Sequence, residues 1–228
     1  MVSRYQFLGM LHEVLQPKTY LDIGVQNGHS LKLVRPGTLG IGVDPAPSPE
    51  AFSIARAVQS VVYRLTSDRF FEECDRSNNV PGKPDLLPPV DFASIDGMHL
   101  FEYALRDFMG CEKWAAPGCV VAFDDVSPYS SLIATRVQPP GDWTGDVWKI
   151  RTILGVYRPE LTRVLVDTFP TGTLLVWGLD PANTLLKDRY ADIEREWLAA
   201  GDGVPPEIIA ERGVQPNVAI EMLKRRST

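Results

Sequence analysis

Acidic residues follow two apolar runs that lie close together in the sequence. Asp96 ends the run that begins at Val90, and the pair Asp124-Asp125 follows the run at 119–123. If both runs are neighbouring parallel strands, the acids meet at the carboxyl edge of one sheet, where open α/β folds bind their ligands. Three converging carboxylates repel one another unless a proton, a partner or a cation neutralises them. We therefore expect Asp96, Asp124 and Asp125 to hold Mg²⁺, or Mn²⁺ in its place. The alternative is that each acid caps the turn after its strand.

A glycine-containing turn lies further towards the N-terminus, where residues 20–30 read YLDIGVQNGHS. This pattern predicts a strand, a tight turn and the start of a helix. Gly24 and Gly28 lack the Cβ atoms that would keep a ligand away from the backbone, and free N–H groups of the next helix favour an anionic group. The spacing differs from the dinucleotide pattern, in which one residue separates the first two glycines. A plain strand-to-helix turn is the alternative, and we expect His29 to pack against the bound molecule.

Polar side chains also follow two other expected strands. Asp44 ends the run at 39–44, where an acid can accept hydrogen bonds from both hydroxyls of a ribose, although Asp-Pro also begins turns. Thr66, Ser67 and Asp68 follow the run at 60–65, where they could contact an adenine edge. Ser67 could instead cap the next helix.

Strand and helix patterns alternate along the chain. Strands are expected over 19–24, 39–44, 60–65, 90–96 and 119–123, and helices over 2–15, 49–59, 101–116 and 147–156. Such alternation is typical of a parallel, doubly wound sheet. Two last strands, at 163–169 and 173–178, are separated by three residues, which permits an antiparallel hairpin but no parallel crossover. The tail from 181 predicts two or three helices that cover the sheet or a partner subunit, as in a homodimer. Their apolar faces are expected to include Ile193, Trp197 and Leu198, and Val218, Met222 and Leu223.

The composition excludes several classes of protein. The 228 residues carry 23 Lys and Arg against 29 Asp and Glu, a net charge of −6, so there is no broad basic surface for nucleic acid. Three cysteines without a Cys-x-x-Cys pair argue against a zinc site and suit a reducing compartment. The N-terminus does not read as a signal peptide, and no apolar run approaches the roughly 20 residues that span a bilayer. We expect a cytoplasmic protein without membrane contact.

The motifs together resemble a known family. The pattern Asp-x-Gly-x-x-x-Gly-x-Ser at 22–30 resembles the first motif of class I S-adenosylmethionine (SAM) dependent methyltransferases. Residues 95–99 and 119–126 resemble metal-dependent O-methyltransferases of that class, and the closer relatives look like sugar O-methyltransferases. The likeness runs over 19–178. It implies a Rossmann-like, seven-stranded, mostly parallel sheet with one antiparallel strand and helices on both faces. Residues 1–180 would form the SAM-binding domain, with a lid loop at 126–148, and residues 181–228 a helical extension.

The resemblance also assigns roles to residues. The acids that match Asp96, Asp124 and Asp125 hold the metal in that family. The SAM site would include Asp22, Gly24, Gly28, Ser30, Asp44, Ser67, Asp68 and Asp96.

The resemblance leaves the identity of the base to be worked out. A second acid often lies two residues after the first metal ligand as a candidate base, but Met98 stands there and cannot take a proton. Related catechol-type enzymes use a lysine three residues after that ligand, and His99 has this spacing. A histidine titrates near neutral pH, so we expect His99 to be the base. A structural histidine at a helix N-terminus is the alternative.

The stretch 143–149, WTGDVWK, looks like a further family signature. Trp143 or Trp148 could stack on a sugar ring, and Arg136 and Lys149 could hold hydroxyls or an acidic group, although a Trp in such a place also packs into cores. Within the family the chain is similar to mycobacterial enzymes that methylate the 1-hydroxyl of methylmannose polysaccharide. The sequence thus predicts SAM- and metal-dependent methylation of a hydroxyl on a sugar or oligosaccharide.

Three other functions stay open. The first is methylation of an aromatic diol, for which the lid should form a flat apolar slot. The second is a nucleotide-sugar-binding or regulatory protein that kept the SAM-binding fold without turnover. The third is methylation of nucleic acid, against which the acidity and the lack of an Asn-Pro-Pro-Tyr type motif argue.

Overall fold

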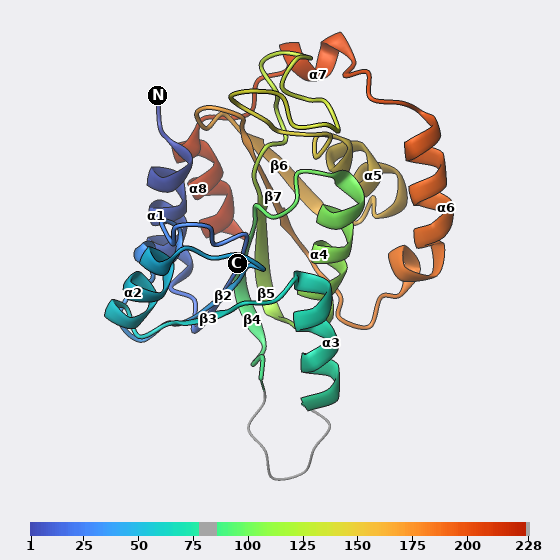
Figure 1. The fold of residues 1–228 in the computed structure, drawn as a ribbon. Helices are drawn as coiled ribbons and strands as arrows, with labels where there is room; N and C mark the ends of the chain where they lie inside the picture. Colours follow the sequence, from blue (N-terminus) through green and yellow to red (C-terminus); the bar gives the residue numbers. More distant parts are fainter. Residues whose placement is uncertain (78–85, 227–228) are drawn as a thin grey trace.

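The computed structural model describes residues 1–77 and 86–226, and these contain one seven-stranded sheet of order β3-β2-β1-β4-β5-β7-β6 (Figure 1). The strands are β1 (Thr19–Ile23), β2 (Leu39–Val43), β3 (Val61–Tyr63), β4 (Val90–Ile95), β5 (Ala115–Phe123), β6 (Thr162–Val166) and β7 (Thr173–Trp177). Strand β7 runs antiparallel to both β5 and β6, and the other neighbouring strands pair in parallel. The predicted α/β fold with one reversed strand is confirmed.

Helices cover both faces of this sheet. One face carries α3 (Ser67–Ser77), α4 (Phe101–Lys113), α5 (Lys149–Tyr157) and α6 (Leu185–Ala199). The other carries α1 (Arg4–Leu15), the 3₁₀ helix η1 (Leu31–Leu33), α2 (Pro49–Ala57) and α8 (Pro216–Arg225). Successive side chains of a strand point to opposite faces, so Leu21 packs into the first apolar cluster and Tyr20 into the second. Burial on both faces explains why the central strands read as continuous apolar runs.

The N-terminal helix α1 is fixed at its first turn. Ser3 and Gln6 form a capping box, in which each side chain bonds the backbone of the other. The backbone next to the cap pairs with Phe169, since Arg4 N donates to Phe169 O at 3.1 Å and Phe169 N donates to Val2 O at 2.9 Å. These bonds place the start of α1 beside the β6–β7 turn, above the carboxyl ends of the strands.

Two local predictions need correction. The helix expected after Gly28 is only the single turn η1, because the hydroxyl of Ser30 donates to Asp22 and caps no backbone N–H. Strand β5 begins at Ala115, before the expected start at Cys119. Pro117 and Gly118 lie inside it, where the β4–β5 register shifts between Val90 and Phe92. A bulge of this kind admits a proline into a strand.

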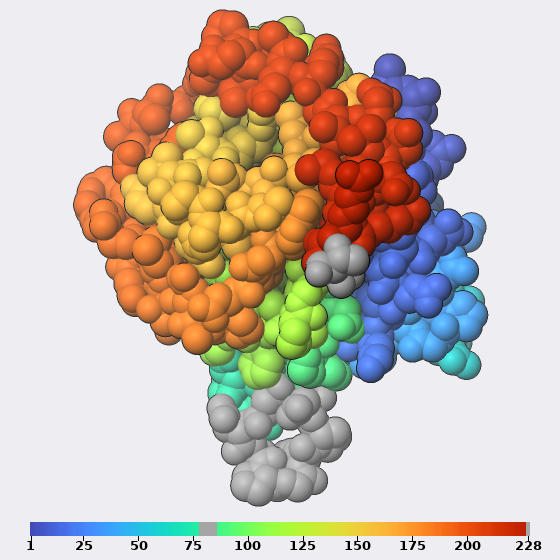
Figure 2. Space-filling view, turned by 180° about the vertical axis from the view of Figure 1, so that it is seen from behind, coloured from blue at the N-terminus to red at the C-terminus, as the bar shows by residue number. Residues whose placement is uncertain are grey.

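The tail helices pack on the same sheet as the rest of the chain. Ile193 of α6 is buried against the α4 and α5 side, and Leu223 of α8 is buried beside α1. Figure 2 shows α8, in red, next to the blue N-terminal segment. Leu198, Val218 and Met222, expected on apolar faces, are exposed, and α8 instead buries Ala219 and Ile220. The short α7 (Pro206–Ala210) packs Ile208 against the loop after β5.

No helix among the described residues combines the length and apolarity needed to cross a bilayer. The three cysteines, Cys74, Cys111 and Cys119, are buried as free thiols.

A buried ion pair gives a test of this packing. Arg158 follows α5 and donates to both carboxylate oxygens of Glu112 on α4, at 2.5 and 2.8 Å, with both side chains almost fully buried. We expect Arg158→Met to lower the free energy of unfolding by about 3–5 kcal/mol, because it leaves a buried carboxylate unpaired. The exposed Arg69, paired with Glu72 and Glu73 within α3, is the matched control, and Arg69→Met should cost less than about 1 kcal/mol. Urea unfolding measures both, and equal losses would contradict this account.

Candidate active site

A cavity of about 530 Å³ opens at the carboxyl ends of β1, β2, β3 and β4. Its wall includes five of the residues predicted for a cofactor site, namely Gly24, Asp44, Ser67, Asp68 and Asp96. Gly97, Met98, His99, Tyr103 and Asp107 close the side towards α4. The volume lies within the usual range of small-molecule and cofactor pockets. Its place at the strand ends is the one expected for ligand binding in an open α/β sheet.

Gly24 makes the turn after β1 possible. Its φ is +90°, and a Cβ there would lie 1.8 Å from the backbone oxygen of Asp96. Both the positive φ and the contact with the β4 end require glycine. The backbones after β1 and β4 therefore meet without a side chain between them, on the floor of the cavity.

Asp22, Gly28 and Ser30, which were also predicted for the cofactor site, do not line this cavity. Asp22 is fully buried and accepts hydrogen bonds from Ser30 Oγ and, at 3.1 Å, from Tyr20 Oη. Burial raises the pKa of Asp22 to about 6, although the bond from Ser30 opposes the shift. A Cβ on Gly28 would lie 3.0 Å from Ala51 Cα, so this glycine lets α2 approach. The three residues are buried and stabilise the turn through these internal contacts.

The acids at the other strand ends are held in place by backbone and side-chain donors. Asp44 accepts from Gln26 N at 2.8 Å and from Ala46 N at 2.7 Å. Asp68 accepts from Arg106 Nε at 2.9 Å. Both carboxylates are therefore fixed at the mouth of the cavity.

Asp107 is a cavity residue that sequence reasoning missed. It lies on α4 three residues after Ala104 and four before Cys111, so it belongs to the buried face of that helix. The helical spacing of these residues in the sequence could have predicted that Asp107 is buried. Burial raises the pKa of Asp107 to about 7, although a hydrogen bond with Ser67 opposes the shift. The cavity thus has a buried carboxyl that holds its proton up to neutral pH.

The acid cluster at the ends of β4 and β5 is partly as predicted. Ligand atoms of Asp96, His99 and Asp125 lie within 4.8 Å of one another. His99 Nε2 is 3.3 Å from Asp96 Oδ1, and His99 Nδ1 is 3.2 Å from Asp125 Oδ2. Nδ1 is also 2.7 Å from Trp143 O, and because a carbonyl only accepts, Nδ1 carries a proton. Thr171 Oγ1 donates to Asp125 Oδ1 at 2.8 Å.

Arg4, from α1, joins this cluster, and nothing local in the sequence indicated it. Its guanidinium bonds Asp96 Oδ2 through Nη1 and lies 3.0 Å from Asp124 Oδ2 through Nε. Asp124 therefore faces Arg4, Asp125 faces His99, and Asp96 contacts both. The other oxygen, Asp124 Oδ1, is buried and has no hydrogen-bond partner among the described residues.

The pKa values of the cluster follow from burial and these contacts. Burial alone would raise the pKa of Asp96, but Arg4 and His99 outweigh it and lower that pKa. Burial raises the pKa of Asp124 to about 8, since the charges of Asp125 and Asp96 offset the help from Arg4. Burial likewise raises the pKa of Asp125 to about 6 against the effect of His99. For His99, burial lowers the pKa, but Asp96 and Asp125 outweigh it and raise it to about 9. The cluster is short of positive charge at Asp124.

The donor set fits a divalent cation. Carboxylate oxygens of Asp96 and Asp125 converge beside the His99 imidazole, and Asp124 Oδ1 is buried nearby without a hydrogen-bond partner among the described residues. A cavity of about 10 Å³ is lined in part by Asp96, His99, Asp124 and Asp125, which is about the space of one water molecule. Such carboxylate oxygens suit Mg²⁺ or Mn²⁺.

The lid loop after β5 places Trp143, one of the four residues predicted for the acceptor, beside His99. Trp143 stacks on His99, with ring centres 5.0 Å apart, and donates from Nε1 to Thr135 O at 2.6 Å. Trp148 is buried with Ala134 and Ile208 and is a core residue, as the alternative interpretation held.

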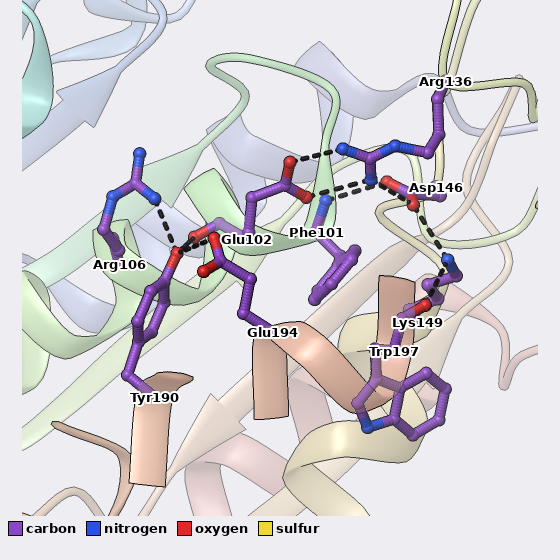
Figure 3. Close-up of polar contacts among 9 residues, drawn as sticks. All are labelled: Phe101, Glu102, Arg106, Arg136, Asp146, Lys149, Tyr190, Glu194 and Trp197. Atoms are coloured by element: carbon purple, nitrogen blue, oxygen red, sulfur yellow. Dashed lines mark hydrogen bonds and ion pairs between the residues drawn. The ribbon is translucent and has the colours of Figure 1, made fainter. Parts of the chain in front are cut away.

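Arg136 and Lys149 also have internal partners, which corrects their assignment to an acceptor (Figure 3). Arg136 pairs with Glu102 and, at 2.7 Å, with Asp146. Lys149, 1% exposed, donates to Asp146 at 3.0 Å and to Trp197 O at 3.0 Å.

This buried network fixes His99. Asp146 Oδ1 accepts from Phe101 N at 2.9 Å, so it caps α4 at the residues that follow His99, and Asp146 N donates to His99 O at 3.2 Å. Figure 3 also shows Tyr190 of α6 bonded to Arg106, which ties the tail to α4. The lid is held on the start of α4 by the buried Asp146–Lys149 pair and by the partly exposed Arg136, and Trp143 of the same loop lies on the imidazole.

Comparison with known proteins agrees with this geometry. Residues 21–126 match a family model described as a methyltransferase domain, Methyltransf_24. A search of curated proteins gives no match. The O-methyltransferase TomG from Streptomyces achromogenes, involved in tomaymycin synthesis and solved with SAM, is 19% identical, with 79% of this chain and 82% of TomG covered and a TM-score of 0.58.

Two more solved structures share the fold. An O-methyltransferase from Bacillus cereus, in complex with SAH, is 18% identical over 77% of this chain and 82% of its own, with a TM-score of 0.55. Cofactor-bound Rv0187 from MTB is 18% identical, with 80% of this chain and 83% of Rv0187 covered and a TM-score of 0.60. Residues 21–126 therefore match a methyltransferase domain, and the chain shares the Rossmann-like fold of these O-methyltransferase structures, in agreement with the predicted fold and class of enzyme.

The proton on Asp107 gives a test that needs no ligand. Its pKa in the folded chain, about 7, lies above the ordinary 3.8, so the folded state binds the proton more tightly than the unfolded one. Stability from this group is present below about pH 4 and is lost as the pH rises towards 7. Between pH 5 and pH 8, Asp107→Asn should therefore gain stability relative to the original chain by roughly 2–4 kcal/mol.

Urea unfolding at the two pH values measures this difference. Asp202→Asn, at an exposed acid, is the control and should follow the original chain. If the Asp107→Asn curve runs parallel to that of the original chain, the carboxyl is ionised in the folded state and our assignment is wrong.

Proposed function

We propose that this protein is a SAM-dependent O-methyltransferase that transfers the methyl group to a hydroxyl of a sugar or oligosaccharide with the help of Mg²⁺ or Mn²⁺. One observation carries the proposal: the cofactor-sized cavity and the acid–histidine cluster share Asp96 and His99. Methyl transfer needs the sulfonium and an activated oxygen side by side and in line. Because Asp96 and His99 belong both to the cavity wall and to the cluster, a cofactor in the cavity would lie next to the groups that activate the acceptor oxygen.

The cavity would hold SAM through contacts at three strand ends. The glycine turn at Gly24 brings backbone close to the cofactor, Asp44 would accept the ribose hydroxyls, and Ser67 and Asp68 would lie near the adenine. TomG and the Bacillus cereus enzyme, solved with SAM and SAH, have this fold and support the choice of cofactor. The reactive methyl belongs to SAM, and the protein supplies its orientation.

His99 would act as the base through Nε2. Its Nδ1–H is engaged with Trp143 O, which fixes the ring and the tautomer in which Nε2 can accept a proton. Asp96, Asp125 and Asp124 would hold the cation. The chemistry that such an ion supplies is positive charge, which lowers the pKa of the acceptor hydroxyl and of the neighbouring imidazole. With the proton on His99, the acceptor oxygen would bond to the methyl carbon of SAM as its carbon–sulfur bond breaks, and S-adenosylhomocysteine would leave.

The acceptor we propose is a sugar hydroxyl, with the 1-hydroxyl of a methylated mannoside as the narrower candidate. Trp143 presents a partly buried aromatic ring beside His99, and such a ring is suited to the apolar side of a sugar. The acidity of the chain is consistent with an uncharged acceptor and not with nucleic acid.

Methyl transfer from labelled SAM tests the proposal. The panel contains mono- and oligosaccharides, including methylated mannosides, together with aromatic diols, each with and without a chelator. We expect transfer to a sugar hydroxyl that falls at least tenfold with chelator and returns with Mg²⁺ or Mn²⁺. Transfer only to diols would replace the acceptor, and SAM binding without transfer to any hydroxyl would favour a binding protein.

Gly24 offers a separate test of the cofactor pocket. Gly24→Ala places a Cβ against the Asp96 backbone, so the pocket floor must move and SAM affinity should fall at least tenfold. Gly37 has the same φ of +90° but open space around it, so Gly37→Ala has equal backbone strain without the clash. Calorimetric titration with SAM should separate the two variants, and equal affinities would place the cofactor elsewhere. Circular dichroism checks that both are folded.

A further inference from the structure

Arg4 spans the two strand ends that carry the cluster. Its guanidinium reaches Asp96 at the end of β4 and Asp124 at the end of β5, and the three side chains are 10–17% exposed. Among the described residues it is the only basic side chain within ion-pair distance of Asp124. A guanidinium is planar, permanently charged and suited to bridging carboxylates. Arg4 therefore already occupies the place of a cation between two of the three acids.

The position of this guanidinium is set by the fold. Arg4 is the first residue of α1, whose cap and backbone bonds to Phe169 fix the helix start. The neighbouring Tyr5 ring lies under the guanidinium, 5.1 Å from ring centre to Cζ. Three separate contacts thus hold one arginine over the cluster.

A metal ion held by Asp96 and Asp124, as the proposed function requires, would compete with Arg4 for their carboxylates. Asp96 Oδ2 and Asp124 Oδ2 both face the guanidinium. Asp124 Oδ1, buried and without a hydrogen-bond partner among the described residues, remains unsatisfied beside it. A buried acceptor left unpaired is costly, so one arginine does not satisfy the demand of this cluster for cations. A divalent ion that satisfies Asp124 must share its carboxylate with Arg4 or replace it.

We propose that Arg4 is the resident counter-ion of the acid cluster and competes with the divalent cation for Asp96 and Asp124, so that the first turn of α1 sets the metal affinity of the enzyme. The inference rests on the proposed function for the presence of a metal, and it adds the residue that regulates it. Coupling is reciprocal: if Arg4 weakens metal binding, metal binding must weaken the hold on Arg4 by the same factor.

Manganese binding measures the competition directly, without turnover. Electron paramagnetic resonance of free Mn²⁺ gives the affinity of the full chain and of three variants. Arg4→Met should bind Mn²⁺ at least tenfold more tightly, because a positive charge close to the ion is removed. Arg4→Lys keeps the positive charge but loses the planar guanidinium that bridges two carboxylates, so its Mn²⁺ affinity should lie between those of the original chain and Arg4→Met. Arg35→Met, at an exposed arginine paired with Glu13, carries the same change of net charge and should stay within twofold.

A purely structural role for Arg4 predicts the opposite direction, since a damaged cluster binds Mn²⁺ more weakly. Unchanged or weaker binding by Arg4→Met, or no Mn²⁺ binding by any form, would overturn the proposal. If Arg4→Met does not fold, Mg²⁺ titration of the original chain serves in its place. The Nε–H signal of Arg4, followed by nuclear magnetic resonance, should lose its protection from exchange as Mg²⁺ binds, and an unchanged signal would sink the idea.

The same samples separate this inference from the proposed function. If Arg4→Met binds Mn²⁺ more tightly but no hydroxyl is methylated, the role of Arg4 as counter-ion is supported and the proposed methyltransferase function is contradicted. Chelator-sensitive methyl transfer without any gain in Mn²⁺ affinity would keep the enzyme and reject the role of Arg4.

Discussion

Repulsion among buried carboxylates is the constraint on which the site depends. Parallel strands β4 and β5 deliver Asp96, Asp124 and Asp125 to one place because the ends of adjacent parallel strands coincide. Each acid taken alone would ionise at low pH, but burial and mutual repulsion raise the pKa of Asp124 and Asp125. The fold can keep them together only by supplying cations from other elements. Arg4 from α1 and His99 from the start of α4 are those cations.

The second requirement is that the cationic residues be held by parts of the chain that do not move with the ligand. His99 is bonded through its backbone to Asp146 and through its ring to Trp143, and Asp146 is itself neutralised by Arg136 and Lys149. The charged side chains of the lid loop therefore serve to position the imidazole. A loop that carries buried ion pairs on its inner side is anchored as firmly as a helix, because breaking one pair leaves a charge in the interior.

Local patterns were enough to predict a mostly parallel sheet, and the three-residue joint left room for its reversed strand. Asp96 and Asp125 meet because the ends of β4 and β5 meet, and His99 follows three residues after Asp96. Local patterns cannot predict contacts between residues that are far apart in the sequence. Arg4 reaches acids 92 and 120 positions away, and no periodicity in α1 distinguishes it from a surface arginine. Lys149 and Arg136 misled for the same reason, since a basic residue in a loop near acids looks like a ligand contact until its buried partners are known.

Asp96 joins the three parts of the site. Its backbone oxygen lies against Gly24 on the cavity floor, its Oδ1 faces His99 and its Oδ2 is bonded to Arg4. A change of charge at one of these partners therefore changes the electrostatic energy of the others, because all of them interact with the same carboxylate. In the low dielectric of the interior this interaction is only weakly screened. A positively charged cofactor in the cavity would also experience this carboxylate. The proton on His99 and the pairing of Arg4 are in this way coupled through the charge of Asp96.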